Sequence, residues 1–124
     1  MKVSTTRQPY TIYTRGSFSE DAWLSGFIAG EGHFGANRSG KRAYPTFRLG
    51  LSIFDKPILI ALTREFGGSL YNHNHRGPNG ETTALVWHIG RRSEIERLVA
   101  YLDRFPLRAK KAEQFKAWRE EFGL

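Results

Sequence analysis

The feature that most constrains the fold of this 124-residue chain is a ten-residue alternation from Tyr44 to Ile53. Its apolar members are Phe47, Leu49, Leu51 and Ile53, and the positions between them are Tyr44, Thr46, Arg48, Gly50 and Ser52. Because successive side chains of a strand point to opposite faces, this period of two predicts a strand with one buried and one wet face. Pro45 favours the start of a strand or a sheet edge.

Other patterns divide the rest of the chain into helices and strands. Helical periodicity predicts helices over about 19–31, 55–66, 93–105 and 109–122. Turn residues and alternation predict further strands over about 33–38, 69–74 and 82–89. The phase of the last strand stays open, because Leu85, Trp87 and Ile89 are bulkier but Ala84 and Val86 could also face inward. The repeated αββ order predicts an α+β fold with one antiparallel four-stranded sheet, covered by helices on one face.

Composition narrows the class of protein. A hydrophobic content of 40% predicts a folded chain, with residues 1–17 as a basic N-terminal tail and 18–124 as a single domain. The absence of cysteine excludes disulfides and thiolate chemistry and favours an intracellular location, and no apolar run predicts a membrane span. A net charge of +7 predicts binding to a polyanion, the alternative being a merely basic soluble protein.

The first predicted helix carries two unusual features. Ser19 is a candidate N-cap, and Gly26 and Gly30 lie on one stripe of the helix. Each glycine costs about 1 kcal/mol of helix stability relative to alanine, which close packing against another helix would offset. Glu31 falls at the C-terminal end, where the helix dipole disfavours an anion. An acid there indicates a bound cation, with free carbonyl groups as further oxygen ligands.

The stretch Leu24-Ser-Gly-Phe-Ile-Ala-Gly-Glu-Gly32 resembles the LAGLIDADG motif of homing endonucleases. Leu24, Gly26, Ile28 and Gly32 match the motif, and Glu31 replaces its penultimate Asp with another carboxylate. Ala29 departs from the first Asp of the motif. The segments 51–56 and 105–111 also resemble family members, so the resemblance covers about residues 19–120.

The resemblance implies a LAGLIDADG homing endonuclease fold, αββαββα, with a saddle-shaped sheet. It implies a homodimer of the single-motif type that makes double-strand breaks in a long, near-palindromic DNA site, usually encoded within an intron or intein. The helix contact between the two copies would use Leu24, Gly26, Phe27 and Gly30.

The resemblance also implies the catalytic residues. Glu31 would bind Mg²⁺ with help from the main chain of Gly30. One of Lys110 and Lys111 would line the active site, and either could take that role. Asp55 would lie near the hydrolytic water; the competing interpretation, held about equal, is that Asp55 only caps the second helix.

The exposed sheet face and the basic turn beside it are expected to contact DNA, because Arg reads guanine and Asn reads adenine in the major groove. An ordinary solvated face is the alternative. The predicted DNA-binding residues are His33, Asn37, Arg38, Lys41, Arg42, Tyr44, Thr46, Arg48, Ser52, Asn72, Asn74, Arg76 and Thr83.

A non-cleaving nucleic-acid-binding protein of the same fold, such as an intron maturase or a regulator, is the rival prediction. The carboxylate and the lysine pair favour the nuclease, because a pure binder needs no acid beside phosphate. A structural dimerisation domain fits poorly with the charge of +7. His73 and His75 could hold a metal in principle, but a DNA contact or a turn edge is favoured.

Overall fold

The computed structural model describes residues 17–73 and 78–124. Its elements run in the order η1 (Phe18–Glu20), α2 (Trp23–Glu31), β1 (Gly32–Ser39), β2 (Arg42–Ser52), η2 (Ile53–Asp55), α3 (Lys56–Phe66), β3 (Ser69–Asn72), β4 (Ala84–Ile89), α4 (Arg92–Arg104) and α5 (Ala109–Phe122). The strands form one sheet in the order β1-β2-β4-β3, and every neighbouring pair is antiparallel. The predicted α+β fold is confirmed. The boundary between tail and domain stays a prediction, because residues 1–16 lie outside the described residues.

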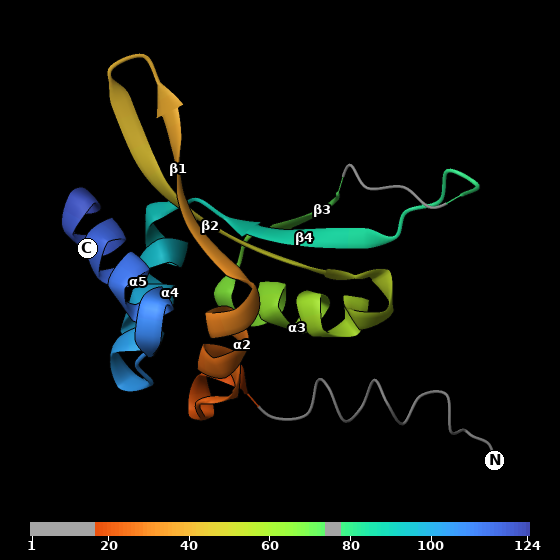
Figure 1. Cartoon of the computed structure of the whole chain (residues 1–124), viewed down its shortest axis with the longest axis horizontal. Helices are drawn as coiled ribbons and strands as arrows, with labels where there is room; N and C mark the ends of the chain where they lie inside the picture. The colour runs from red at the N-terminus through yellow and green to blue at the C-terminus, as the bar shows by residue number, and fades with distance from the viewer. Residues whose placement is uncertain (1–16, 74–77) are drawn as a thin grey trace.

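All four α-helices lie on one side of the sheet (Figure 1). The opposite side is open, and the β1–β2 hairpin projects beyond the remaining strands, which gives the sheet its saddle shape (Figure 1). The apolar stripes predicted for α3 and α4 are buried as expected: Ile58, Leu59, Leu62, Phe66, Ile95, Leu98, Val99 and Leu102. The helices therefore protect one face of the sheet and leave the other available.

The buried face of the sheet follows the alternation of β2. Phe47 and Leu49 are fully buried, and their cross-strand partners Ile89 and Trp87 are fully buried with them. This register decides the phase of β4 that the sequence left open: Leu85, Trp87 and Ile89 face the helices, and the residues between them face outward. Although β2 is an inner strand, its ladder with β4 starts only at Phe47, so Pro45 interrupts no bond to β4.

The first helix begins later than predicted. Ser19 does not cap it, since α2 starts at Trp23 and the Asp21 carboxylate accepts the Trp23 amide at 3.0 Å. The preceding residues are instead held by Glu65 of α3. Its carboxylate accepts hydrogen bonds from the amides of Phe18 and Ser19, both at 2.7 Å, and from the Ser17 hydroxyl. Burial raises the pKa of Glu65, but these bonds outweigh it and lower the pKa.

The end of β2 also differs from the prediction. Ile53 leaves the strand and opens the turn η2, where the Ser52 hydroxyl accepts the Phe54 amide at 3.2 Å. Serine competes for backbone donors in this way, which stops the ladder. β3 likewise ends at Asn72 rather than Asn74. The sequence therefore predicted each strand, but not the residue at which it ends.

Candidate nucleic-acid interface and active site

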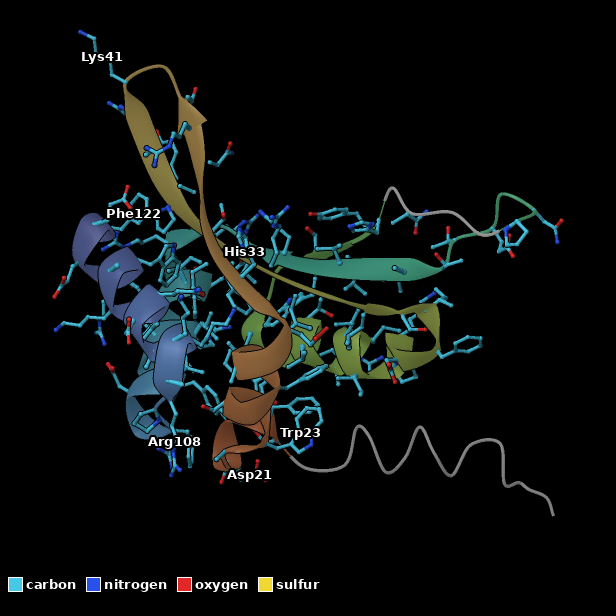
Figure 2. The ribbon with its side chains drawn as sticks, in the orientation of Figure 1. Asp21, Trp23, His33, Lys41, Arg108 and Phe122 are labelled. Atoms are coloured by element: carbon cyan, nitrogen blue, oxygen red, sulfur yellow. The ribbon has the colours of Figure 1, made fainter. Side chains whose placement is uncertain are left out.

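One row of polar side chains crosses the whole open face. His33 of β1 is paired with Arg48 of β2, Arg48 with His88 of β4, and His88 with Ser69 of β3. Cross-strand partners share a face, so the four side chains project from the same side of the sheet. Figure 2 shows His33 on this open side, at the middle of the saddle. None of the residues in the four strands is Asp or Glu. The open face is therefore suited to contact an anionic surface.

Most of the predicted contact residues are exposed at the surface. The exposed members are His33, Asn37, Arg38, Lys41, Arg42, Tyr44, Arg48, Ser52 and Asn72. Lys41 stands at the tip of the projecting hairpin (Figure 2). Thr46 shares the open face, but its side chain is only 8% exposed. Thr46 is thus part of the floor of this surface and not a projecting contact.

Three of the predicted contact residues face away from the open side. Asn72 is paired with Leu85 and follows Leu70 by two residues, so the prediction that it lies on the open face is wrong. Thr83 is half-buried just before β4, in the phase of Leu85, and its carbonyl accepts the Ile53 amide at 3.0 Å. Arg38 donates to Glu121 of α5 at 3.4 Å, on the helix side.

The predicted contacts Asn74 and Arg76 lie outside the described residues.

Sequence reasoning missed three open-face residues. His88, Tyr71 and Ser69 project from β4 and β3, and the rings of Tyr71 and His88 lie 6.3 Å apart. A strict alternation around Leu70 would have found Tyr71 and Ser69, because this apolar residue lies between them and favours the core. The position of His88 on the open face follows from the burial of Trp87, the residue before it in β4.

Glu31 is the last residue of α2, as predicted, and its side chain is exposed. The chain turns directly into β1 at Gly32, whose amide donates to the Ile28 carbonyl. A Cβ at Gly32 would lie 2.7 Å from the Ile28 side chain and 2.9 Å from the Phe47 ring. Only glycine permits this close approach, which fixes the main chain at the junction of α2 and β1, directly after Glu31.

The structure distinguishes the two candidate lysines. Lys111 is half-buried, and its ammonium group donates to the Gly32 carbonyl at 2.7 Å, next to Glu31. Lys110 is exposed and forms no hydrogen bond or ion pair with the residues that the structure describes. Burial, followed by the positive charges of Arg48 and Lys111, lowers the pKa of His33. Arg48 and Lys111 thus both act electrostatically on the start of β1.

Asp55 occupies the N-cap position of α3, but its side chain makes no cap hydrogen bond. The capping interpretation therefore loses its main support. No hydrogen bond or ion pair between described residues joins Asp55 to Glu31 or Lys111 either. The structure brings Lys111 to the main chain next to Glu31 and shows no link from Asp55 to either residue.

The donors near Glu31 fit a hard divalent cation only in part. Its carboxylate and the free carbonyls of the last helical turn are oxygen donors of the kind that Mg²⁺ prefers. Among residues 17–73 and 78–124, however, no group of three or more His, Cys, Asp or Glu side chains could hold a metal. One chain therefore offers an incomplete site, which phosphate oxygens and a second carboxylate would complete.

The outer face of α2 is open. A Cβ at Gly26 or Gly30 would meet nothing within 4 Å, and Phe27 is half-buried. Trp23 is 49% exposed and stacks beside Phe27 at 5.1 Å between ring centroids. Leu24 is fully buried in the chain's own core, so its predicted place in a dimer interface is wrong.

No helix in the described part of the chain combines the length and apolar character of a membrane span.

Comparison with known proteins identifies the family to which this architecture belongs. The sequence model of the family described as LAGLIDADG endonuclease matches residues 24–122. The probable intron-encoded endonuclease Cox1-I1b of Schizosaccharomyces pombe is 29% identical over 111 residues, which cover 85% of this chain and 27% of that protein.

Solved structures agree with the sequence comparison. The homing endonuclease I-TnaI superposes with a TM-score of 0.65 and 28% identity, covering 79% of this chain and 67% of that one. The LAGLIDADG homing endonuclease I-GzeII, solved in complex with its DNA target, has the same fold, with a TM-score of 0.68 at 24% identity, covering 79% of this chain and 33% of that one. This chain belongs to the LAGLIDADG endonuclease family.

Proposed function

We propose that this protein is a site-specific endonuclease that cuts both strands of a DNA duplex. The observation that carries the proposal is the bond from the Lys111 ammonium group to the carbonyl of Gly32, the residue that follows the exposed acid Glu31, where α2 enters a sheet whose strands contain no acid. A protein that only binds DNA gains nothing from a carboxylate next to phosphate, because the two repel each other.

The open face suits the major groove of a duplex. The eleven residues of β2 extend over about 36 Å at 3.3 Å per residue, close to one turn of duplex. Arg48 supplies donors for base edges, while Lys41 and Arg42 at the hairpin tip supply charge for phosphates. The similarity of fold to I-GzeII, which was solved in complex with its DNA target, supports duplex DNA as the ligand.

Hydrolysis would take place where α2 meets β1. Glu31, with the main chain of Gly30, would hold Mg²⁺, and the bound ion supplies positive charge at the scissile phosphate and a more acidic water. Lys111 is anchored on the Gly32 carbonyl, so its charge is already in place to stabilise the negative charge that develops on the phosphate. His33 follows Glu31 by two residues, and burial together with the positive charges of Arg48 and Lys111 lowers its pKa.

The active unit would be a homodimer. Each chain has one such carboxylate, and two are needed for two strands; packing α2 against its mate along Gly26 and Gly30 would bring both Glu31 side chains to the centre of a near-palindromic site. Gly26→Leu should block this contact and yield a monomer in sedimentation. Ser39→Leu, in the hairpin, serves as a control; an intact Gly26→Leu dimer would contradict the packing.

Similarity to an intron-encoded endonuclease supports a gene that lies within an intron or intein. The protein would then act in the compartment that houses that gene, the cytoplasm or an organelle.

The decisive experiment incubates the protein with a duplex library that includes the uninterrupted insertion-site sequence of its own gene. Wild type, Glu31→Gln and Glu20→Gln are compared in Mg²⁺ and in Ca²⁺. Glu20 is an exposed acid just before α2, so it controls for the change of charge. We expect double-strand cutting by wild type and Glu20→Gln in Mg²⁺ alone, and a loss of about 10³-fold in Glu31→Gln.

Specific binding with no cutting by any of the three proteins would overturn the nuclease proposal and establish the rival, a non-cleaving binder of the same fold. Equal cutting by wild type and Glu31→Gln would remove Glu31 from the active site.

A further inference from the structure

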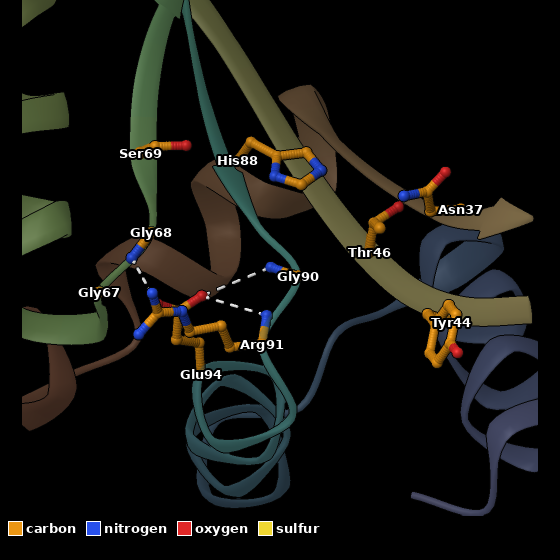
Figure 3. A pocket seen from close by; sticks show the side chains of 10 residues that line it. All are labelled: Asn37, Tyr44, Thr46, Gly67, Gly68, Ser69, His88, Gly90, Arg91 and Glu94. Carbon is orange, nitrogen blue, oxygen red and sulfur yellow. Dashed lines mark hydrogen bonds between the residues drawn. The ribbon is translucent and has the colours of Figure 1, made fainter. Parts of the chain in front are cut away.

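His88 stands at the centre of the open face but has no place in the activity described so far. It is half-buried on β4, paired with Arg48 on one side and with Ser69 on the other. Figure 3 shows its ring between Ser69 and Thr46, beside a cleft of about 650 Å³. Its position is that of a residue that meets whatever the saddle binds.

The imidazole ring of His88 has the Tyr71 ring on one side and Gly90 on the other. The Tyr71 ring lies 6.3 Å away on the same face. On the other side, a Cβ at Gly90 would come within 3.2 Å of His88 Cε1 and 3.8 Å of the Thr46 methyl group. The missing side chain of Gly90 thus makes the space that the ring uses.

The hydrogen-bonding groups of this row are free for a ligand. Among the described residues, no hydrogen bond or ion pair engages the His88 ring or the Arg48 guanidinium. The one carboxylate in the cleft, that of Glu94, already accepts bonds from the amides of Gly68, Gly90 and Arg91 (Figure 3). Donors therefore dominate the surface around His88.

We propose that Arg48 and His88 together select two neighbouring G·C base pairs in each half-site, with His88 as a specificity-determining residue. Guanine is the base that presents two acceptors, N7 and O6, in the major groove, whereas adenine adds a donor. Arg48 offers only donors, and His88 offers a ring N–H. This inference rests on the proposed function, because it assigns base readout to the same DNA-binding face.

The spacing of the strands supports neighbouring contacts. Adjacent strands lie about 4.8 Å apart, so the two side chains leave the sheet side by side, well within the roughly 12 Å width of the major groove. Arg48 and His88 belong to the inner strands β2 and β4, whereas His33 belongs to the edge strand β1 next to Lys111. The inner pair would thus face base edges, and His33 the phosphate backbone.

The experiment selects bound duplexes from a randomised library in Ca²⁺, which permits binding while cutting is suppressed. The proteins are wild type, His88→Gln and the control Lys116→Gln, which changes an exposed residue of α5 on the helix layer. We expect wild type and Lys116→Gln to select the same site, with two adjacent G·C pairs per half-site. His88→Gln should change one of these to A·T, because Gln reads adenine, with a shift in preference on the order of tenfold.

A second measurement needs no variant and so does not depend on its folding. In the site selected by wild type, 7-deazaguanine replaces each guanine in turn, which removes the N7 acceptor. Weakening on the order of tenfold at two adjacent positions supports the proposal.

Selection of one site by both wild type and His88→Gln would overturn the role of His88 alone. Full binding to every 7-deazaguanine duplex would overturn guanine readout by both Arg48 and His88. Failure of wild type to select any sequence would instead overturn the proposed function, and this inference with it.

Discussion

The two faces of the sheet are made by alternate residues of the same strands, yet they have opposite properties. Toward the helices, Phe47, Leu49, Trp87 and Ile89 are fully buried and packed against one another. Toward the open side, Arg48 and His88 carry hydrogen-bonding groups that no described residue uses. Neighbouring residues of one strand therefore have different roles: one side chain stabilises the fold, and the next belongs to the proposed DNA-binding face.

Because the two faces differ in this way, mutations should affect either the stability of the fold or the contact with DNA, but not both. The buried face holds most of the apolar core, whereas the side chains of the open face, apart from Val86 and Thr46, are less buried. Substitutions on the first face should unfold the protein, and substitutions on the second should leave a folded protein with altered activity. Four predictions test this separation, in decreasing order of expected effect.

Trp87→Ala should lower the free energy of unfolding by about 3–5 kcal/mol, because it leaves a large cavity in the core. It also removes the partner of the Gly67 carbonyl, which the indole N–H meets at 2.8 Å. Urea denaturation measures the loss. Tyr71→Ala, an aromatic deletion on the open face, should cost less than about 1.5 kcal/mol. A comparable loss of unfolding free energy in the two variants would show that the two faces contribute equally to stability.

Lys111→Ala should reduce the rate of DNA cutting by about 10²-fold, since it removes a positive charge fixed beside Glu31. Lys110→Ala is the matched control, because it removes the same charge one residue away from an exposed side chain. Single-turnover cutting at saturating protein separates this effect from binding. If Lys110→Ala slows cutting as much as Lys111→Ala, the anchored lysine has no special role.

Arg48→Ala should weaken binding by about 1–3 kcal/mol and relax the base preference at one position in each half-site. Arg64→Ala removes the same charge from α3 on the helix layer and should leave the preference unchanged. Binding to single-base-pair variants of the target measures both. An unaltered preference profile for Arg48→Ala would remove this residue from the readout.

Glu65→Gln should lower stability by about 1 kcal/mol at neutral pH, because it weakens the bonds that hold Ser17 to Ser19. The pKa of Glu65 is lowered from its ordinary value of 4.5, so its contribution is complete above about pH 4.5 and is lost as the pH falls through the folded-state pKa. Denaturation from pH 7 to pH 3 should show wild type and variant converging at low pH. A constant gap would show that the charge is not responsible.

The sequence predicted the architecture well, because the decisive patterns are local. The period of two in β2, the apolar stripes of α3 and α4, and the bounds of α5 can all be read from neighbouring residues. The motif around Glu31 likewise placed this carboxylate at the end of α2.

The errors arose where distant residues decide the outcome. Asn72 is an exception, because the apolar Leu70 two residues before it already indicated the helix-facing side, as its pairing with Leu85 of β4 shows. Ser19 was an adequate N-cap by type, but Glu65, 46 residues away, holds its amide. The choice between Lys110 and Lys111 also needed the approach of α5 to β1. None of these contacts has a signature in nearby sequence.

The approach of α5 to β1 also sets the order in which a newly made chain acquires its proposed activity. Lys111 bonds to Gly32 across 79 residues, and the Trp118 indole bonds to the Gly35 carbonyl across 83. A ribosome releases Glu31 long before either partner, so a nascent chain has the carboxylate without the lysine that completes the pair. If the proposed activity depends on Lys111 as expected above, a chain whose synthesis has not reached α5, or a product truncated before it, would cut DNA more slowly than the complete fold.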